Sequence, residues 1–217
     1  MNVPPIFEKL ESAGVLAVVI LDDAATAVPL AKALLAGGVN AMELTLRTDA
    51  ALDALSAIRR EVPDMLVGAG TILKPEQVSQ VFDRGALFGV SPGLNVRVVE
   101  TALESGLPFA PGIATPSDIE AAIELGCRHL KFFPAETLGG LSYLRAMSPP
   151  YNHLGIKYIP LGGVGAGNLA QYIVDPLIAC VGGSWLTPAD KIAAKDWKAI
   201  EELASQARTT IDTARSK

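Results

Sequence analysis

Apolar positions along the chain fall into short runs that alternate with longer amphipathic segments. Runs of about four to eight apolar and β-branched residues are typical of buried strands, whereas apolar residues at helical spacing are typical of helices packed against a sheet. The runs predict eight strands: Val15–Leu21, Ala41–Leu46, Leu66–Thr71, Leu87–Ser91, Pro108–Gly112, His129–Phe133, Lys157–Leu161 and Ala179–Gly183.

The segments between these strands are rich in Ala and Leu, and several begin with Pro, Ser or Asp and end at Gly, as helices do. Eight strand–helix units with short connections close more naturally into a (β/α)8 TIM barrel than into an open sheet, although a strand count alone leaves a doubly wound sheet open. We expect an α/β fold, a single (β/α)8-barrel domain over residues 1–217 with a short N-terminal helix. The predicted helices include Ala24–Ala36, Ala50–Glu61, Pro75–Arg84 and Ser117–Leu125.

Composition narrows the class of protein. Half of the 217 residues are apolar and 19% are charged, which favours a large core over a disordered chain. The net charge is −5 and no segment gathers Lys or Arg, so nucleic acid is not an expected partner. Gly, Pro or charged residues interrupt every apolar stretch before it reaches membrane-spanning length, so a membrane is not expected either. Met1–Glu11 lacks the pattern of a secretion signal, and Cys127 and Cys180 form no C-x-x-C pair. We expect a soluble, cytoplasmic protein with two reduced, partly buried thiols.

Two charged residues interrupt apolar strands. Lys131 lies within His-Leu-Lys-Phe-Phe-Pro, where an apolar setting disfavours the ammonium and raises the fraction of neutral amine that can attack a carbonyl carbon. Glu43 shares a strand face with Thr45 and Arg47, so Glu43 could move protons while Arg47 grips a carboxylate. The alternatives are structural: Glu43 forms a buried ion pair with Arg47 or with Lys131, or Lys131 extends its ammonium to the barrel mouth.

Glycines gather at the ends of the last two predicted strands. Active sites of (β/α)8 barrels lie where strands pass into loops, and a phosphate site is common after strands seven and eight. Candidates for such a site are Gly162, Gly163, Gly183 and Ser184, the alternative being ordinary glycine turns. We reject the dinucleotide pattern at Gly165–Ala170, which lies beyond the strand and lacks a following acid. Only two widely separated histidines occur, so no metal site is expected.

Several motifs in fixed order carry a resemblance to a known family. The chain resembles the 2-keto-3-deoxy-6-phosphogluconate (KDPG) aldolases, class I aldolases of the KDPG/KHG aldolase family, from about Val15 to Pro188. The motifs are Glu43-Leu-Thr-Leu-Arg47, Gly68-Ala-Gly-Thr71, Ser91-Pro-Gly93, Pro111-Gly-Ile113, Lys131-Phe-Phe-Pro-Ala-Glu136 and Gly182-Gly-Ser-Trp185.

The resemblance implies a homotrimeric (β/α)8 barrel of the Entner–Doudoroff pathway that uses no metal or other cofactor. Its substrate would be a phosphorylated keto sugar acid, cleaved to pyruvate and glyceraldehyde 3-phosphate. Lys131 would form the imine with the C2 ketone, and Glu43 would be the acid and base. By matching position, Arg47 and Thr71 would bind the pyruvyl carboxylate, Pro92 and Phe133 would wall the imine, and Gly162, Gly163 and Ser184 would bind phosphate.

One position departs from the family pattern. The family's usual strand-seven ending is Pro-Thr-Gly-Gly, whereas this chain has Pro160-Leu161-Gly162-Gly163, so the substrate-contacting position lacks its hydroxyl. The related 2-keto-3-deoxy-6-phosphogalactonate aldolases carry an apolar residue there, while Ser184 favours the gluconate branch. The galactonate epimer and a side activity on 4-hydroxy-2-oxoglutarate stay open. Two rivals from other classes also remain: a phosphate-binding isomerase or epimerase in which Lys131 supplies only charge, and a non-catalytic phosphosugar-binding protein.

Overall fold

The computed structural model describes residues 4–216. Met1–Val3 and Lys217 lie outside the described residues, and so does the start of Met1–Glu11, the segment in which no secretion signal is predicted. The strands are β1 (Val15–Val19), β2 (Ala41–Thr45), β3 (Leu66–Gly70), β4 (Gly89–Val90), β5 (Phe109–Ala110), β6 (Gly112–Ile113), β7 (His129–Phe132), β8 (Lys157–Pro160) and β9 (Val181–Gly183). The α-helices are α1 (Pro5–Ala13), α2 (Ala27–Ala36), α3 (Ala51–Glu61), α4 (Pro75–Asp83), α5 (Val96–Glu104), α6 (Pro116–Glu124), α7 (Gly140–Met147), α8 (Leu169–Ile173), α9 (Ala189–Ala193) and α10 (Trp197–Arg215).

The strands pair in parallel and form two sheets, ordered β5-β4-β3-β2-β1-β9 and β6-β7-β8. Each predicted strand contains an observed one, but the predicted strand Pro108–Gly112 is divided into β5 and β6. Pro111 lies between them and has no N–H to donate to a neighbouring strand, which explains the break. A parallel bridge from Tyr158 to Ile178 links β8 to the segment before β9. The structure confirms the parallel α/β class, with its strands in two sheets.

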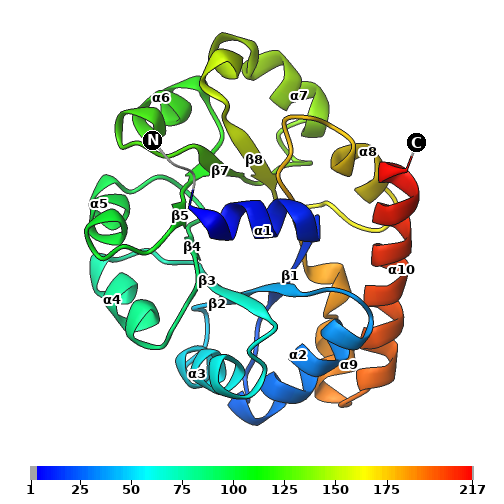
Figure 1. Ribbon diagram of the computed structural model, residues 1–217. Helices are drawn as coiled ribbons and strands as arrows, with labels where there is room; N and C mark the ends of the chain where they lie inside the picture. Colours follow the sequence, from blue (N-terminus) through cyan, green and yellow to red (C-terminus); the bar gives the residue numbers. More distant parts are fainter. Residues whose placement is uncertain (1–3, 217) are drawn as a thin grey trace.

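The helices form a ring around the strands, and α1 lies across them (Figure 1). All four helices named from the sequence are present, with one refinement: the predicted Ala24–Ala36 begins as a 3-10 turn, Ala24–Thr26, before α2. The Asp23 side chain caps this turn by accepting a hydrogen bond from the backbone N–H of Ala25 at 2.9 Å. Within residues 4–216, no helix combines the length and the apolar character needed to cross a membrane.

Alternation along the strands separates two apolar cores. On β1, for example, Leu16 belongs to a core enclosed by the strands, whereas Val15 and Ala17 pack toward the helices. We call the enclosed core the inner cluster. Its members are Ile6, Phe7, Leu10, Ala13, Leu16, Ala41, Phe88, Val90, Ala110, Ile159, Leu161, Ala179 and Cys180.

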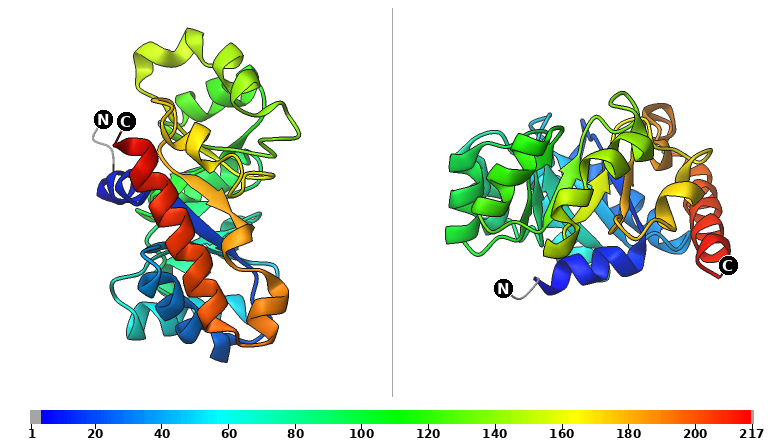
Figure 2. Two further views of the ribbon diagram at one scale, coloured as in Figure 1. Left: turned by 90° about the vertical axis from the view of Figure 1, so that its right-hand side faces the viewer. Right: turned by 90° about the horizontal axis from the view of Figure 1, so that it is seen from above.

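Helix α1 closes one end of the inner cluster. It supplies four buried side chains and passes through Gly14, in the left-handed region at φ 78°, directly into the first residue of β1. It therefore lies at the amino ends of the parallel strands, below them in the right-hand view of Figure 2. We call this region the floor.

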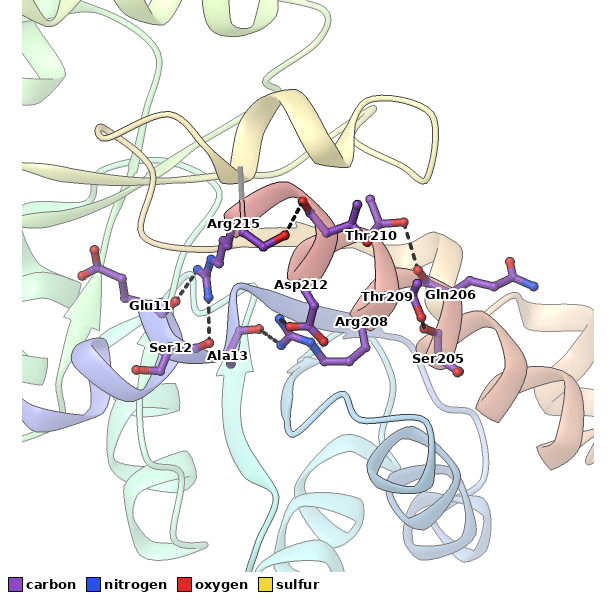
Figure 3. Close-up of polar contacts among 12 residues, drawn as sticks. Glu11, Ser12, Ala13, Ser205, Gln206, Arg208, Thr209, Thr210, Asp212 and Arg215 are labelled. Carbon is purple, nitrogen blue, oxygen red and sulfur yellow. Dashed lines mark hydrogen bonds and ion pairs between the residues drawn. The ribbon is translucent and has the colours of Figure 1, made fainter.

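Polar contacts from α10 hold α1 in place (Figure 3). Arg208 donates a hydrogen bond to the carbonyl of Ala13 at 2.9 Å. Arg215 donates to the carbonyls of Ser12 at 3.0 Å and Glu11 at 2.7 Å. The last carbonyls of a helix have no partner within that helix, so the two guanidinium groups satisfy the end of α1.

Candidate active site

Glu43 and Lys131 meet among the strands as a buried ion pair. Glu43 lies on β2 and Lys131 on β7, far apart in sequence, with side chains 1% and 6% exposed. The Lys131 Nζ donates to Glu43 Oε1 at 3.1 Å and lies 3.5 Å from Oε2. The ring of Phe133 covers the ammonium, its centroid 5.6 Å from Nζ. Two buried charges seldom add stability over an apolar pair, so this arrangement needs a reason other than packing.

The pair lies in a cavity of about 320 Å³ at the carboxyl ends of the strands. Every site residue predicted from the sequence lines this one cavity, and none is placed elsewhere. The predicted residues that line it are Glu43, Arg47, Thr71, Pro92, Lys131, Phe133, Leu161, Gly162, Gly163, Gly183 and Ser184.

Arg47 and Thr71 lie at the rim of the cavity, where their strands have ended. The Arg47 side chain is exposed and forms no ion pair with any residue of the described part of the chain, so its guanidinium is free to bind an anion. Thr71 has φ 59°, an uncommon conformation for a β-branched residue. Such backbone conformations concentrate at binding sites, where the surrounding structure maintains them.

The predicted phosphate-binding residues form the side of the cavity after β8 and β9. Gly162 and Gly163 have φ values of 92° and 85°, a region that favours glycine. Packing also requires a glycine at position 183, because a Cβ there would lie 1.6 Å from the Trp185 ring. The hydroxyl of Ser184 and the backbone N–H groups on this side of the cavity can act as hydrogen-bond donors, which a phosphate group requires.

Five residues that the sequence had not assigned to the site also line the cavity. Thr45 had been placed on the Glu43 face by strand alternation, and its hydroxyl donates to the Val19 carbonyl at 3.1 Å. The apolar members gave no signal, because an apolar residue at a strand end looks the same whether it lines a site or a core. The five are Val18, Ile20, Thr45, Val164 and Gly182.

The other titratable groups considered from the sequence lie outside the cavity. Burial lowers the pKa of His129 to about 4, and its ring stacks on Phe7 of α1 at 4.3 Å. His153 is exposed in a 3-10 turn. Cys127 and Cys180 are free and buried, as predicted; burial raises the pKa of Cys127 to about 11 and also raises that of Cys180. Both thiols are therefore poor nucleophiles.

The sequence raised two other kinds of site, a dinucleotide-binding loop and a metal site. The Gly165–Ala170 segment begins in the loop between β8 and α8, where the Asn168 side chain accepts from the Gly165 N–H at 2.7 Å. Among the residues that the structure describes, no three His, Cys, Asp or Glu side chains gather where they could hold a metal ion.

Comparisons with known proteins agree with this geometry. The sequence model of the KDPG and KHG aldolases matches residues 6–203. A curated relative from Treponema pallidum, 2-dehydro-3-deoxy-phosphogluconate aldolase, is 47% identical over 201 residues, covering 93% of this chain and 95% of that protein.

Solved structures give the same result. The KDPG aldolase of Zymomonas mobilis with 3-phosphoglycerate superposes with a TM-score of 0.88 at 38% identity, covering 95% of this chain and 96% of that one. The Legionella pneumophila enzyme, with pyruvate captured as a covalent carbinolamine, also gives 0.88, at 36% identity and 95% and 98% coverage. The chain belongs to the KDPG and KHG aldolase family.

Proposed function

We propose that this chain is a class I aldolase that cleaves 2-keto-3-deoxy-6-phosphogluconate to pyruvate and glyceraldehyde 3-phosphate in the Entner–Doudoroff pathway. The observation that carries the proposal is the buried Lys131–Glu43 pair, with 3.1 Å between Nζ and Oε1, inside a cavity of about 320 Å³. The pair supplies a nucleophile and an acid–base group within hydrogen-bond reach, as covalent aldol chemistry requires.

The first half of the reaction forms an imine. Glu43 takes a proton from Nζ, and the neutral amine attacks the C2 ketone to give a carbinolamine. Glu43 returns the proton as the carbinolamine hydroxyl leaves as water, and the protonated imine remains. The covalent carbinolamine captured in the Legionella enzyme is the same kind of adduct in a relative. Phe133 and Pro92 wall the cavity and shield this intermediate from water.

The second half breaks the C3–C4 bond. Glu43, directly or through water, removes the proton of the C4 hydroxyl; the C3–C4 electron pair moves into the imine, and glyceraldehyde 3-phosphate leaves. The resulting enamine takes a proton at C3 from Glu43, and water releases pyruvate from Lys131. The protonated imine on Lys131 accepts the electron pair of the breaking bond, so this route needs no cofactor as electron sink.

Two groups of residues position the substrate. Arg47 and the Thr71 hydroxyl bind the pyruvyl carboxylate from the rim, Arg47 through a charge-assisted contact. Gly162, Gly163, Gly183 and Ser184 bind the phosphate with backbone N–H groups and one hydroxyl. The 3-phosphoglycerate that accompanies the Zymomonas enzyme is a phosphorylated three-carbon acid, consistent with a phosphate site in this family.

Leu161 favours a second candidate substrate, 2-keto-3-deoxy-6-phosphogalactonate, which is to be tested beside the gluconate epimer. It is 4% exposed and presents an apolar wall where the family usually places a threonine hydroxyl. The galactonate epimer differs from the gluconate epimer at C4, so a lost hydrogen bond there weakens discrimination between them. Cleavage of 4-hydroxy-2-oxoglutarate as a side activity needs Lys131 and Glu43 but not the phosphate-binding residues.

The decisive experiment couples two measurements. Pyruvate release is measured from both C4 epimers with and without a chelator, and the protein is reduced with borohydride in the presence of pyruvate. We expect chelator-resistant turnover, faster with the gluconate epimer, and a mass increase confined to the Lys131 peptide. An unchanged mass with no pyruvate release would contradict the aldolase and favour the isomerase.

We further propose one (β/α)8-barrel domain that assembles as a homotrimer in the cytoplasm. Supporting barrel closure, β5 and β6 follow each other around Pro111, and Tyr158 pairs with Ile178 beside β9. The trimer is implied by the family resemblance, and sedimentation velocity tests it directly: a monomer at micromolar concentration would contradict it.

A further inference from the structure

Gly70 lies against the Glu43 carboxylate. In the pairing of β2 with β3, Gly68 is the register partner of Glu43, and Gly70 is the partner of Thr45. A Cβ at Gly70 would nevertheless lie 1.7 Å from Glu43 Oε1 and 2.4 Å from Cδ, far inside van der Waals contact. The Glu43 side chain therefore leans along the strand and occupies the space that any other residue at position 70 would fill.

The neighbouring glycine on the same strand face has a different occupant. A Cβ at Gly68 would lie 2.5 Å from Cε2 and Cζ of Phe88, a residue of the inner cluster. The Phe88 ring thus takes the space directly across from Glu43. The space at Gly70 is the one left for the carboxylate, and we call it the Gly70 seat.

The Gly70 seat matters for the position of Glu43 because few hydrogen bonds hold its carboxylate. Within residues 4–216, the Glu43 carboxylate accepts hydrogen bonds from Lys131 alone. In the proposed reaction, the same Nζ becomes part of the imine, so this contact changes while Glu43 must still reach the C4 hydroxyl and C3. The shape of the strand surface does not change with the reaction.

We propose that Gly70 is a positioning residue: the missing side chain at Gly70 keeps the Glu43 carboxylate beside the imine throughout the cycle. This inference rests on the proposed aldolase function. The backbone of Gly70 lies outside the left-handed region, since its φ is not positive, so conformational freedom does not explain a glycine there. The close approach of the carboxylate does.

Gly70→Ala tests the proposal through partial reactions. Pyruvate trapping by borohydride reports Lys131, whereas exchange of the pyruvate methyl protons in D2O reports the acid–base step. We expect the final extent of trapping to stay within a few-fold of the wild type, because slower imine formation still reaches completion while Lys131 is present. The value of kcat and the rate of proton exchange should fall about 10²-fold, the size of an acid–base contribution. The control is Gly167→Ala, because a Cβ at this exposed glycine meets no atom within 4 Å. Unchanged exchange in Gly70→Ala would overturn the proposal.

A stability cycle keeps the test informative even if Gly70→Ala is inactive for other reasons. In the wild-type background, Gly70→Ala should lower Tm. In a Glu43→Ala background the same substitution should lower Tm less, because the added methyl group has room there. An equal loss of Tm in both backgrounds would contradict the proposal that the Glu43 carboxylate occupies the Gly70 seat. If the wild type traps no pyruvate, the aldolase proposal fails instead, and the cycle still decides whether Glu43 occupies the seat.

Discussion

Lys131 and His129 lie two positions apart on β7, facing the same way, and each is 5% exposed. Their surroundings differ completely. Lys131 faces a carboxylate and a cavity at the carboxyl ends of the strands, whereas His129 stacks on Phe7 at the floor, with ring centroids 4.3 Å apart and an interplanar angle of 4°. In the proposed mechanism, equally buried residues therefore take part in chemistry at one end of the strand and in packing at the other.

The two ends are also built from different residues. Glycines and polar side chains form the cavity around Lys131, while α1 closes the floor with Ile6, Phe7, Leu10 and Ala13. Larger hollows do occur, one of about 580 Å³ beside the floor, between α1 and Arg208, and one of about 740 Å³ lined by α8 and the end of α10, but neither is lined by a buried lysine–carboxylate pair. Size alone would choose another hollow; the buried ion pair is the feature that favours the smaller cavity as the active site of the proposed aldolase.

The largest effect should come from Lys131→Met, which keeps an unbranched side chain and removes the amine. Without the nucleophile no imine forms, and we expect kcat to fall by about 10⁴-fold or more, equivalent to about 5.5 kcal/mol of activation free energy. The measurement is pyruvate release, together with borohydride trapping.

The matched control is Lys157→Met on the adjacent strand β8. Lys157 is 31% exposed, pairs with Glu11 at the floor and does not line the cavity. Its loss should leave turnover within about two-fold, as for most surface substitutions away from a site. Comparable losses of activity in both variants would mean that the two ends of the molecule are not functionally separate.

Much of the difference between the cavity end and the floor end of the strands could be predicted from the sequence. Strand and helix periods gave the parallel α/β class and the positions of nearly every strand, and a charged residue inside an apolar strand drew attention to Lys131 and Glu43. The division at Pro111 was missed because a strand end is decided by hydrogen-bond partners as well as by the residue pattern. The first strand and α1 were placed correctly, but no sequence signal showed that α1 would cover His129.

The Gly70 seat marks the limit of sequence reasoning at the site. Gly68 and Gly70 look equivalent in the motif Gly68-Ala-Gly-Thr71, yet one admits an aromatic ring and the other a carboxylate. The difference depends on how Glu43 leans along β2 and on where Phe88 of another segment lies. Neither follows from strand alternation, which assigns a side chain to a face but not to a neighbour.

At the floor, Phe7→Ala should show the reverse of the pattern expected for Lys131→Met, a loss of stability without a loss of activity. Phe7 is 3% exposed and contacts His129, so truncation leaves a cavity in the inner cluster and should lower the free energy of unfolding by about 3–5 kcal/mol. Urea unfolding measures this loss, and activity per folded molecule should stay near the wild-type value. The exposed Phe82 gives the control, since Phe82→Ala should cost less than about 0.5 kcal/mol.

His129 should make the floor sensitive to acid. Burial lowers its pKa to about 4 from an ordinary value of 6.5, and two charged groups also affect it, Glu11 of α1 raising the pKa and Lys157 of β8 lowering it. The folded state therefore favours neutral His129, and this contribution is complete above pH 6.5 and is lost as the pH falls toward 4. Its size is about 3 kcal/mol at most.

His129→Phe isolates this contribution, because phenylalanine can keep the stack on Phe7 without a titrating group. The free energy of unfolding is measured by urea at several pH values between about 7 and 4. The wild type should lose about 2–3 kcal/mol more than His129→Phe over this range. Parallel pH curves for the two proteins would show that His129 is not the acid-sensitive group of the floor.

The smallest effect should come from the ion pair at the edge of the floor. Glu11 Oε1 lies 3.1 Å from Lys157 Nζ, and the side chains are 42% and 31% exposed, so Glu11→Gln should cost about 0–1 kcal/mol and less in high salt. Glu8→Gln on the same helix is the control, since Glu8 is exposed and forms no ion pair with a described residue. Because Glu11 raises the pKa of His129, its removal lowers that pKa further and should deepen the acid-induced loss of stability. A loss that is unchanged from that of the wild type, or shallower, would contradict the action of Glu11 on the pKa of His129.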